Sequence, residues 1–302
     1  MTSEAHSAAD AGTWLLGDLT VNRVGFGAMR LTGSAAFHLG TPRSREGSIQ
    51  VLRRALSLGV NHIDTAAFYF SSLRSANELI NSALAPYPDD LVIVTKVGPG
   101  RDASGEWMPL ARPDQLRGQI EENLRQLGRD HLDVVNLRRQ PGMESVAEHF
   151  GALAELREAG LIGHLGISDI GTAHLAEAQE IAPVVCVQNR YGVDHRPPDT
   201  VALLARCAEQ NVAFVPFFAI AGAGGPMGTG DSEPADVLSV AEETGATAAQ
   251  VRLAWTLHQG EHVLAIPGTG DLEHLSENIA AGAIRLSNGQ LQRLGSIAPI
   301  ES

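Results

Sequence analysis

Short, continuous apolar runs alternate along the chain with longer segments in which apolar residues recur every three or four positions. Continuous runs rich in valine and isoleucine are typical of strands buried on both faces of a parallel sheet, whereas the longer period is that of an amphipathic helix. The pattern predicts eight strands, at residues 21–29, 60–66, 91–97, 132–138, 161–168, 184–189, 212–218 and 263–268.

Helices are predicted in the intervals between these strands. In residues 44–58, for example, Ile49, Leu52 and Leu56 fall near one face, and Gly59 provides a stop. The same spacing predicts helices at 113–127, 144–159, 172–181, 198–210, 234–243 and 272–281, with extra helices at 246–258 and 285–297.

The alternation predicts an α/β fold, a (β/α)8 or TIM barrel that forms a single domain over residues 13–302, with extra helices near the C-terminus. The competing doubly wound sheet would need a glycine-rich fingerprint in its first strand–helix turn. Residues 30–41, which form that turn, contain no GxGxxG sequence. Residues 1–12 are small and polar, and we expect them to form a disordered tail.

Composition and charge narrow the class of protein. The chain has 302 residues, of which 44% are hydrophobic, and a formal net charge of −13. This charge argues against a nucleic-acid or anionic-membrane partner, because both require a basic surface. The first residues lack the basic and apolar regions of a secretory signal, and no apolar run reaches the ~18 residues of a membrane span. We therefore expect a cytoplasmic protein, whose oligomeric state the sequence does not indicate.

Neither the cysteines nor the histidines indicate a redox or metal centre. Cys186 and Cys207 form no CxxC motif, and we expect both to be reduced, structural thiols. His258 and His262 are four residues apart, but Gly260 lies between them and no carboxylate or cysteine completes a ligand set. No metal site is predicted.

The most specific chemistry lies around Tyr69. Asp64 ends the second predicted strand, Tyr69 follows five residues later, and Lys96 lies near the end of the third strand. A free tyrosine is a weak acid with a pKa of about 10. A nearby lysine cation would stabilise the phenolate and lower that pKa, and an aspartate would keep the lysine charged and oriented. The three residues are therefore predicted to form a proton donor for a carbonyl oxygen.

Further polar and aromatic residues fall at the same end of the predicted barrel. The carboxyl ends of the strands carry the chemistry in TIM barrels, so residues that end the later strands are candidates for the same site. They are Arg138, Ser168, Asp169, Gln188, Asn189, Phe217, Phe218, Pro267, Gly268 and Thr269.

The segments NHIDTAAFY, VTKVG, LGISD, VQNRY, PFFAI and IPGTG…HLSEN resemble, in order and spacing, the aldo-keto reductase superfamily over about residues 15–297. The resemblance implies a (β/α)8 barrel that binds NADPH, or else NADH, without a Rossmann motif and reduces a small aldehyde or ketone. It implies Asp64, Tyr69 and Lys96 as three members of a catalytic tetrad, with Tyr69 as general acid. It also implies cofactor contacts by Ser168, Asp169 and Gln188 at the nicotinamide carboxamide, by Phe217 on its ring, and by Gly268, Thr269, His274, Glu277 and Asn278 toward the adenosine end.

Two positions depart from the family pattern. Where the family usually has histidine at the end of strand four, this chain has Arg138, a permanent charge with several fixed donors. We expect Arg138 to complete the tetrad by polarising the carbonyl oxygen, or to pair with a substrate anion; the plainer alternative is an ion pair with a neighbouring acid. At the 2′-phosphate position many members carry lysine and arginine, whereas this chain has Gly268 and His274. A preference for NADPH is still expected.

The arginine variant resembles a bacterial, pyridoxal reductase-like branch that reduces pyridoxal to pyridoxine with NADPH. Pyridoxal carries a phenolic oxygen beside its aldehyde, and one guanidinium at Arg138 would reach both oxygens. Two other functions stay open: a tailoring ketoreductase or epimerase of secondary metabolism, and a cofactor-binding regulatory protein with little turnover. Trp107 is predicted to line the substrate pocket or simply to pack on the rim, and the glycine-rich run 221–230 to form a flap over the cofactor or a flexible surface loop.

Overall fold

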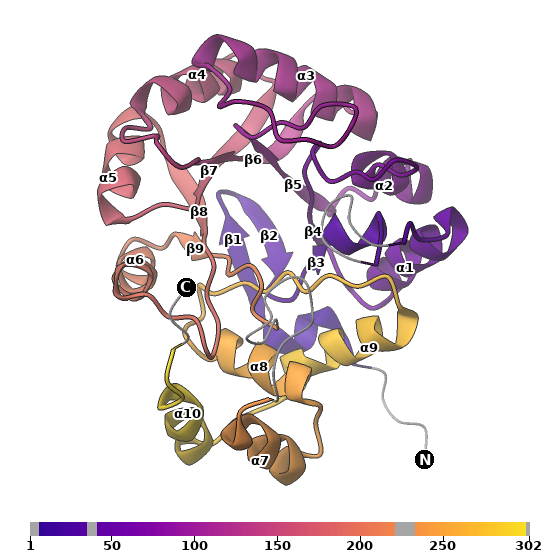
Figure 1. The fold of residues 1–302 in the computed structure, drawn as a ribbon, viewed down its shortest axis with the longest axis vertical. Coiled ribbons are helices and arrows are strands. Elements are labelled where there is room, and N and C mark those ends of the chain that lie inside the picture. Colours follow the sequence, from indigo (N-terminus) through magenta and orange to yellow (C-terminus); the bar gives the residue numbers. More distant parts are fainter. Residues whose placement is uncertain (1–5, 35–40, 221–232, 300–302) are drawn as a thin grey trace.

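The barrel strands lie in one curled, parallel sheet. The computed structural model describes residues 6–34, 41–220 and 233–299. Seven strands are hydrogen-bonded in sequence order and are all parallel (Figure 1). They are β3 (Phe26–Gly27), β4 (His62–Asp64), β5 (Val92–Val97), β6 (Leu132–Arg138), β7 (Ile162–Ser168), β8 (Val184–Gln188) and β9 (Ala213–Phe214).

The eighth predicted strand closes the ring through isolated bridges. Val263 pairs with Phe214 of β9, and Ala265 pairs with Val24 just before β3, both in parallel orientation. The predicted (β/α)8 barrel is confirmed, although the predicted strand 263–268 contributes bridges rather than a continuous ladder.

Both faces of the sheet are buried. On β5, Val92 and Val94 pack in a cluster inside the barrel, whereas Ile93 and Val97 pack in the larger cluster between the sheet and the helices. This arrangement explains why the strand sequences are continuous apolar runs rather than alternating ones. It also fixes which residues point into the barrel, since neighbouring residues of a strand face opposite sides.

A hairpin that the sequence pattern did not predict covers the amino-terminal end of the barrel. Its two strands pair antiparallel and lie within the ring of parallel strands in Figure 1. Leu16 and Val21 pack in the barrel interior, and Asp18 in the turn lies 2.7 Å from His164 near the start of β7. The predicted strand 21–29 is therefore wrong as a single element, since one strand ends in the hairpin before the barrel strand begins. The hairpin strands are β1 (Thr13–Leu16) and β2 (Leu19–Asn22).

Part of the segment predicted to be a disordered tail is a helix. Ala8–Ala11 forms a 3₁₀ helix with Ser7 as its N-cap, and Ala8 is fully buried. The Ala8 N–H donates to the carbonyl of Leu58 at 2.8 Å. The expected disordered tail over residues 1–12 is thus wrong for residues 8–11, because their small side chains pack against the barrel; residues 1–5 lie outside the described part of the chain.

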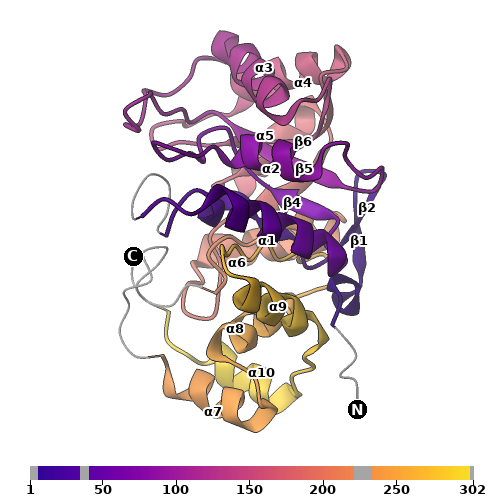
Figure 2. The same cartoon turned by 90° about the vertical axis from the view of Figure 1, so that its right-hand side faces the viewer.

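Helices surround the sheet in both views (Figures 1 and 2). The helix between β4 and β5 was not predicted, although Ser75 caps it by accepting a hydrogen bond from the Glu78 N–H. No helix among the described residues is long and apolar enough to cross a membrane. The α-helices are α1 (Arg45–Ser57), α2 (Ala76–Leu84), α3 (Leu116–Leu127), α4 (Ala147–Glu158), α5 (Thr172–Ile181), α6 (Pro198–Glu209), α7 (Ala235–Thr244), α8 (Ala248–Leu257), α9 (Leu272–Ala280) and α10 (Asn288–Gly295); short 3₁₀ turns lie at Ala28–Leu31, Pro113–Gln115 and Ala281–Ala283.

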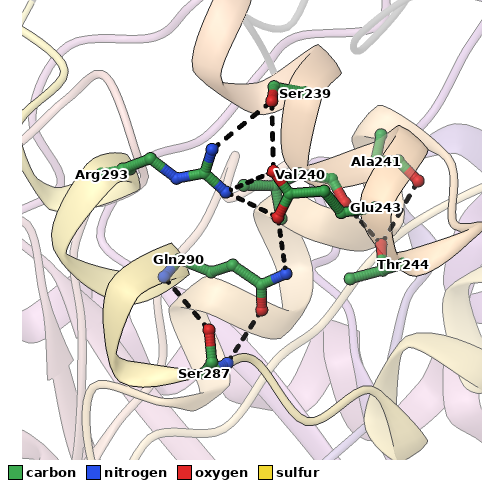
Figure 3. Close-up of polar contacts among 8 residues, drawn as sticks. All are labelled: Ser239, Val240, Ala241, Glu243, Thr244, Ser287, Gln290 and Arg293. Carbon is green, nitrogen blue, oxygen red and sulfur yellow. Dashed lines mark hydrogen bonds and ion pairs between the residues drawn. The ribbon is translucent and has the colours of Figure 1, made fainter.

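The last helix is attached to the outside of the barrel. Arg293 of α10 pairs with Glu243 of α7 at 2.6 Å, and the Gln290 amide donates to the same carboxylate at 3.0 Å (Figure 3). Ser287 caps α10 and exchanges hydrogen bonds with Gln290. Since both side chains of the ion pair are exposed, solvent screens it, and we expect it to contribute little to stability.

Both cysteines are free and buried, as predicted. Burial raises the pKa of each thiol, Cys186 and Cys207, to about 12. Both therefore stay protonated at neutral pH, which is the state expected of structural rather than reactive thiols.

Candidate active site

The predicted site residues on the strands lie close together because of where they fall along each strand and which face of the sheet they occupy. Each lies at or near the carboxyl end of its strand and at a position that points into the barrel. This arrangement places Asp64 on β4, Lys96 on β5, Arg138 on β6, Ser168 on β7 and Gln188 on β8 around one end of the barrel. It is the end at which TIM barrels carry their chemistry.

Asp64 and Lys96 form a buried ion pair. The Lys96 Nζ lies 2.5 Å from Asp64 Oδ1 and also donates to the carbonyl of Thr65 at 3.1 Å. Both side chains are only 4% exposed. Burial alone would lower the pKa of Lys96, but the Asp64 carboxylate and the Tyr69 phenol outweigh it, so the pKa lies above its usual value. Lys96 is therefore a permanent cation at neutral pH.

Gln188 completes the environment of Asp64. Its Nε2 donates to Asp64 Oδ2 at 2.8 Å, so each carboxylate oxygen has a donor. The Gln188 Oε1 is buried and has no hydrogen-bond partner among the described residues. A buried acceptor without a donor costs free energy, which makes this oxygen a candidate acceptor for an N–H group of a ligand.

Tyr69 lies in the loop after β4, next to the ion pair. The side chain is 9% exposed, and Lys96 Nζ lies 5.0 Å from the centre of its ring. Burial raises the pKa of the Tyr69 phenol above its usual value, and the Lys96 cation opposes this effect. The predicted influence of the lysine is present, but it does not lower the pKa overall, because burial is the larger effect. The phenol is therefore a protonated donor at neutral pH.

Arg138 lies beside this group and is paired with an acid. Its Nη1 donates to the Ser168 hydroxyl at 3.2 Å, and its Nη2 lies 3.6 Å from Asp169 Oδ2. The guanidinium carbon is 5.1 Å from the centre of the Phe217 ring. Both interpretations of Arg138 thus have support: it lies at the mouth of the barrel, and it pairs with a neighbouring acid.

Asp169 reaches Arg138 through an unusual backbone conformation. Its φ is +64°, in the left-handed region that aspartate and asparagine tolerate better than most residues. Its N–H donates to the carbonyl of Gln188 at 3.0 Å, which holds the turn after β7. The carboxylate is therefore held at the rim of the site rather than free to move with a flexible loop.

The predicted adenosine-end residues form a second group. Thr269 follows the closing segment 263–265, and its hydroxyl accepts a hydrogen bond from the Asp271 N–H at 3.1 Å. Gly268 packs so closely on Gly27 that a Cβ would meet the Gly27 carbonyl. Asn278 is buried, and its Nδ2 has no partner among the described residues. His274, Glu277 and Asn278 all belong to α9.

Arg43 packs on Gly270, next to this second group, which sequence reasoning did not foresee. A Cβ at Gly270 would overlap the Arg43 guanidinium, so the two residues are packed together. The amides of His274 and Glu273 lower the pKa of Asp271, and the Arg43 cation adds to this effect. A cation therefore lies near the start of α9. This is the region in which many members of the family resembled carry lysine and arginine, whereas this chain has Gly268 and His274.

A buried polar network behind the ion pair was also missed. The Thr65 hydroxyl donates to Asn77 Oδ1 at 2.8 Å, and Asn77 Nδ2 donates to Asn123 Oδ1 at 3.0 Å. The Thr95 hydroxyl donates to the same Asn123 oxygen at 2.6 Å. All four residues are fully buried. Since Thr65 follows Asp64 and Thr95 precedes Lys96, the network links the ends of β4 and β5 through α2 and α3.

Trp107 adjoins the site through an aromatic neighbour. Its ring centre lies 5.7 Å from that of Phe68, and the Phe68 and Tyr69 rings are T-shaped to each other with their centres 5.2 Å apart. Trp107 is 51% exposed, so it still presents apolar surface, separated from the candidate proton donor by the Phe68 ring. Both earlier interpretations, a pocket wall and a tryptophan packed on the rim, fit this position.

Two further predictions concern a metal site and the glycine-rich run 221–230. Among the described residues no group of three or more histidine, cysteine, aspartate or glutamate side chains is arranged to hold a metal ion. The glycine-rich run 221–230 lies outside the described residues.

The chain is similar to known proteins over nearly its whole length. The model of the aldo/keto reductase family matches residues 23–299. The pyridoxine 4-dehydrogenase of Escherichia coli (strain K12) is 43% identical over 295 residues, which cover 95% of this chain and 99% of the relative. An uncharacterized oxidoreductase of Schizosaccharomyces pombe is 34% identical and covers 97% of this chain and 92% of its own.

Solved structures show the same fold. A thermostable aldo-keto reductase in complex with the inhibitor epalrestat has a TM-score of 0.78 and 30% identity, covering 93% of this chain and 96% of that one. An aldo-keto reductase from Klebsiella pneumoniae in complex with NADPH has a TM-score of 0.75 and 27% identity, covering 93% and 92%. The chain therefore belongs to the aldo/keto reductase family and is an NAD(P)H-dependent oxidoreductase.

Proposed function

We propose that this protein reduces an aldehyde or ketone to an alcohol with NADPH, and that pyridoxal is its substrate. The observation that carries the proposal is the buried group formed by Asp64, Lys96 and Tyr69 at the mouth of the barrel. The similarity to a pyridoxine 4-dehydrogenase over nearly the full chain supports the choice of substrate.

The residues of the site fit a nicotinamide dinucleotide. The unpaired Gln188 Oε1 is an acceptor suited to the carboxamide N–H, and the fully buried Ser168 hydroxyl lies next to it on β7. The unpaired Asn278 Nδ2 is a donor suited to the adenosine end. When bound, the dinucleotide supplies the hydride that the carbonyl carbon accepts.

Proton delivery follows from the environment of Tyr69. Because burial raises its pKa, the phenol holds its proton at neutral pH until a carbonyl oxygen becomes basic enough to accept it. As that proton leaves, the neighbouring Lys96 cation stabilises the phenolate, and Asp64 keeps Lys96 charged and oriented. Positioned acid catalysis of this kind contributes typically 10²–10⁴-fold.

Arg138 gives the site its substrate preference. Its guanidinium has five N–H donors, and the bond to Ser168 and the loose pair with Asp169 leave donors for other oxygens. A guanidinium at this place stabilises the developing alkoxide and also attracts an anion beside the carbonyl. Pyridoxal offers both an aldehyde oxygen and an adjacent phenolic oxygen.

The test is an assay of NADPH oxidation with matched aldehydes. Purified protein is given pyridoxal, pyridine-4-carboxaldehyde, which lacks the phenolic oxygen, and benzaldehyde. The proposal predicts the highest kcat/KM for pyridoxal. Turnover of the simple aldehydes with no response to pyridoxal would refute the substrate and keep the reductase.

The same experiment addresses the other functions. Binding of NADPH in a fluorescence titration, without turnover of any carbonyl, would favour a cofactor-binding regulatory protein. Turnover confined to larger ketones would favour a tailoring ketoreductase. We also propose a cytoplasmic location, for which the two free, buried cysteines are the structural support.

A further inference from the structure

A buried arginine lies near the start of the loop that follows β5. Arg101 is 8% exposed, and its backbone pairs with Trp107 in an isolated antiparallel bridge. The residues between them therefore form a narrow loop. The Arg101 Nε donates to the carbonyl of Gly105 at 2.8 Å, which fixes the guanidinium to its own loop.

The same guanidinium holds the chain on both sides of Tyr69. Its Nη1 donates to the carbonyl of Phe68 at 3.1 Å and to that of Phe70 at 2.9 Å. The guanidinium carbon also lies 4.4 Å from the centre of the Phe70 ring, a favourable cation–π contact. One side chain thus binds both neighbours of the candidate proton donor.

The backbone of Tyr69 itself is also fully engaged. Its N–H donates to the carbonyl of Ala66, and its own carbonyl accepts from the N–H of Ala76, the first residue of α2, both at 2.9 Å. The three consecutive carbonyls of residues 68–70 are therefore all hydrogen-bonded. Arg101 satisfies two of the three, so its loss would leave the buried Phe68 carbonyl and the part-buried Phe70 carbonyl without this donor.

We propose that Arg101 is a positioning residue for Tyr69, and that through it the position of the Tyr69 phenol depends on the loop that carries Trp107. The proposal rests on the proposed function, because that function gives Tyr69 its role as proton donor. The Arg101 guanidinium lies 5.8 Å from the centre of the Trp107 ring. A substrate packed against Trp107 therefore contacts the loop whose guanidinium holds Tyr69 in place.

Lysine can replace only some of the contacts of this arginine. A lysine at position 101 keeps a charge and can donate to one of the carbonyls, but it lacks the planar group that spans Gly105, Phe68 and Phe70. We therefore expect Arg101→Lys to lose part of the effect and Arg101→Met to lose all of it. A proton donor displaced by about 1 Å can cost on the order of 10²-fold in rate.

The experiment compares wild type, Arg101→Met and Arg101→Lys with the control Arg112→Met. Arg112 lies at the end of the same loop, is exposed, and pairs with exposed Asp114. Three quantities are measured: hydrogen exchange of peptides covering residues 66–76, kcat with the best carbonyl substrate, and the Kd for NADPH. Hydrogen exchange reports on the loop whether or not the protein turns over a carbonyl.

The proposal predicts faster exchange in residues 66–76 for both Arg101 variants and a kcat reduced about 10–10²-fold in Arg101→Met. It also predicts an unchanged Kd for NADPH, and an Arg112→Met variant like wild type. Wild-type exchange and wild-type kcat in both Arg101 variants would overturn it. If Arg101→Met fails to fold, Arg101→Lys decides by the same criteria.

Failure of the proposed function gives a different result. If the wild-type protein reduces no carbonyl, the reductase assignment fails, and the exchange data alone still decide whether Arg101 holds the Tyr69 segment. If turnover is normal and residues 66–76 do not respond to the loss of Arg101, the reductase stands and the role of Arg101 is refuted.

Discussion

The guanidinium of Arg138 lies 3.6 Å from the carboxylate of Asp169, across the carboxyl ends of two neighbouring strands. The two side chains are 29% and 45% exposed, so solvent screens the pair and it restrains Arg138 only weakly. Asp169 therefore orients the arginine only loosely, and N–H donors of Arg138 remain available to a substrate. This relationship joins the two interpretations of Arg138, as an ion-pair partner and as a substrate-binding group.

The substrate preference is expected to depend on this guanidinium. Arg138→Met should reduce kcat/KM for pyridoxal by roughly 10³-fold, because both the alkoxide contact and the phenolate contact disappear. The loss with pyridine-4-carboxaldehyde should be smaller, about 10²-fold, since only the alkoxide contact disappears. Steady-state kinetics with both aldehydes give the comparison.

The neighbouring arginine provides a matched control. Arg139 donates through Nε to the carbonyl of Met143, and Arg139→Met should leave the ratio between the two aldehydes unchanged. Equal losses for both aldehydes in Arg138→Met would show that Arg138 does not recognise the phenolic oxygen.

Cofactor preference is expected to depend on Arg43. It is packed over Gly270 and is close enough to Asp271 to affect its pKa, in the region where the family resemblance indicates the 2′-phosphate. Arg43→Ala should weaken NADPH binding by about 10-fold, in line with the loss of one charge-assisted contact, and leave NADH binding nearly unchanged. Fluorescence titrations with both dinucleotides test this; an equal effect on both would contradict it.

The pH dependence should differ between the two directions of the reaction. Burial holds the pKa of the Tyr69 phenol above its usual value of about 10, so the acid form predominates throughout the neutral range. Reduction uses the protonated phenol and should stay constant with rising pH until the phenol begins to ionise. Alcohol oxidation uses the phenolate and should rise with pH over the same range.

Lys96→Met offers a check on this assignment. Loss of the cation should raise the pKa of the phenol further, because Lys96 opposes the effect of burial more strongly than Arg138, the other cation that lowers this pKa. The rate of alcohol oxidation should therefore fall more than the rate of carbonyl reduction at a given pH. Identical pH profiles in the two directions would contradict the role of Tyr69 as the titrating group.

The sequence predicts much of the site because it shows where each strand ends and which residues of a strand share a face. Asp64, Lys96 and Gln188 each end a recognisable apolar run, so a parallel barrel brings them to one rim, and the structure shows them in direct contact. The eight-fold alternation likewise predicts the barrel. These features depend on local periodicity, which a single sequence contains.

What the sequence did not reveal depends on burial and on contacts between distant positions. The sign of the pKa shift of Tyr69 follows from burial, which is not visible in a loop sequence. Asn123 meets Thr95 from 28 positions away, and Arg101 meets the Phe68 carbonyl from 33 positions away. Nothing in the local pattern marks either residue as a partner.

The N-terminal hairpin was missed for a related reason. Its inner residues, Leu16 and Val21, are buried by the barrel, and the short strands on either side of Gly17 and Asp18 merge with the next apolar run. The pattern showed apolar residues but not the reversal of direction between them.

The Tyr69→Phe variant, which removes only the phenolic hydroxyl, tests whether Tyr69 is the proton donor. We expect kcat for carbonyl reduction to fall about 10²–10⁴-fold, because the proton donor is lost while the ion pair of Asp64 and Lys96 remains. The Kd for NADPH should stay as in wild type. A Tyr69→Phe variant that turns over at a rate close to wild type would contradict the account.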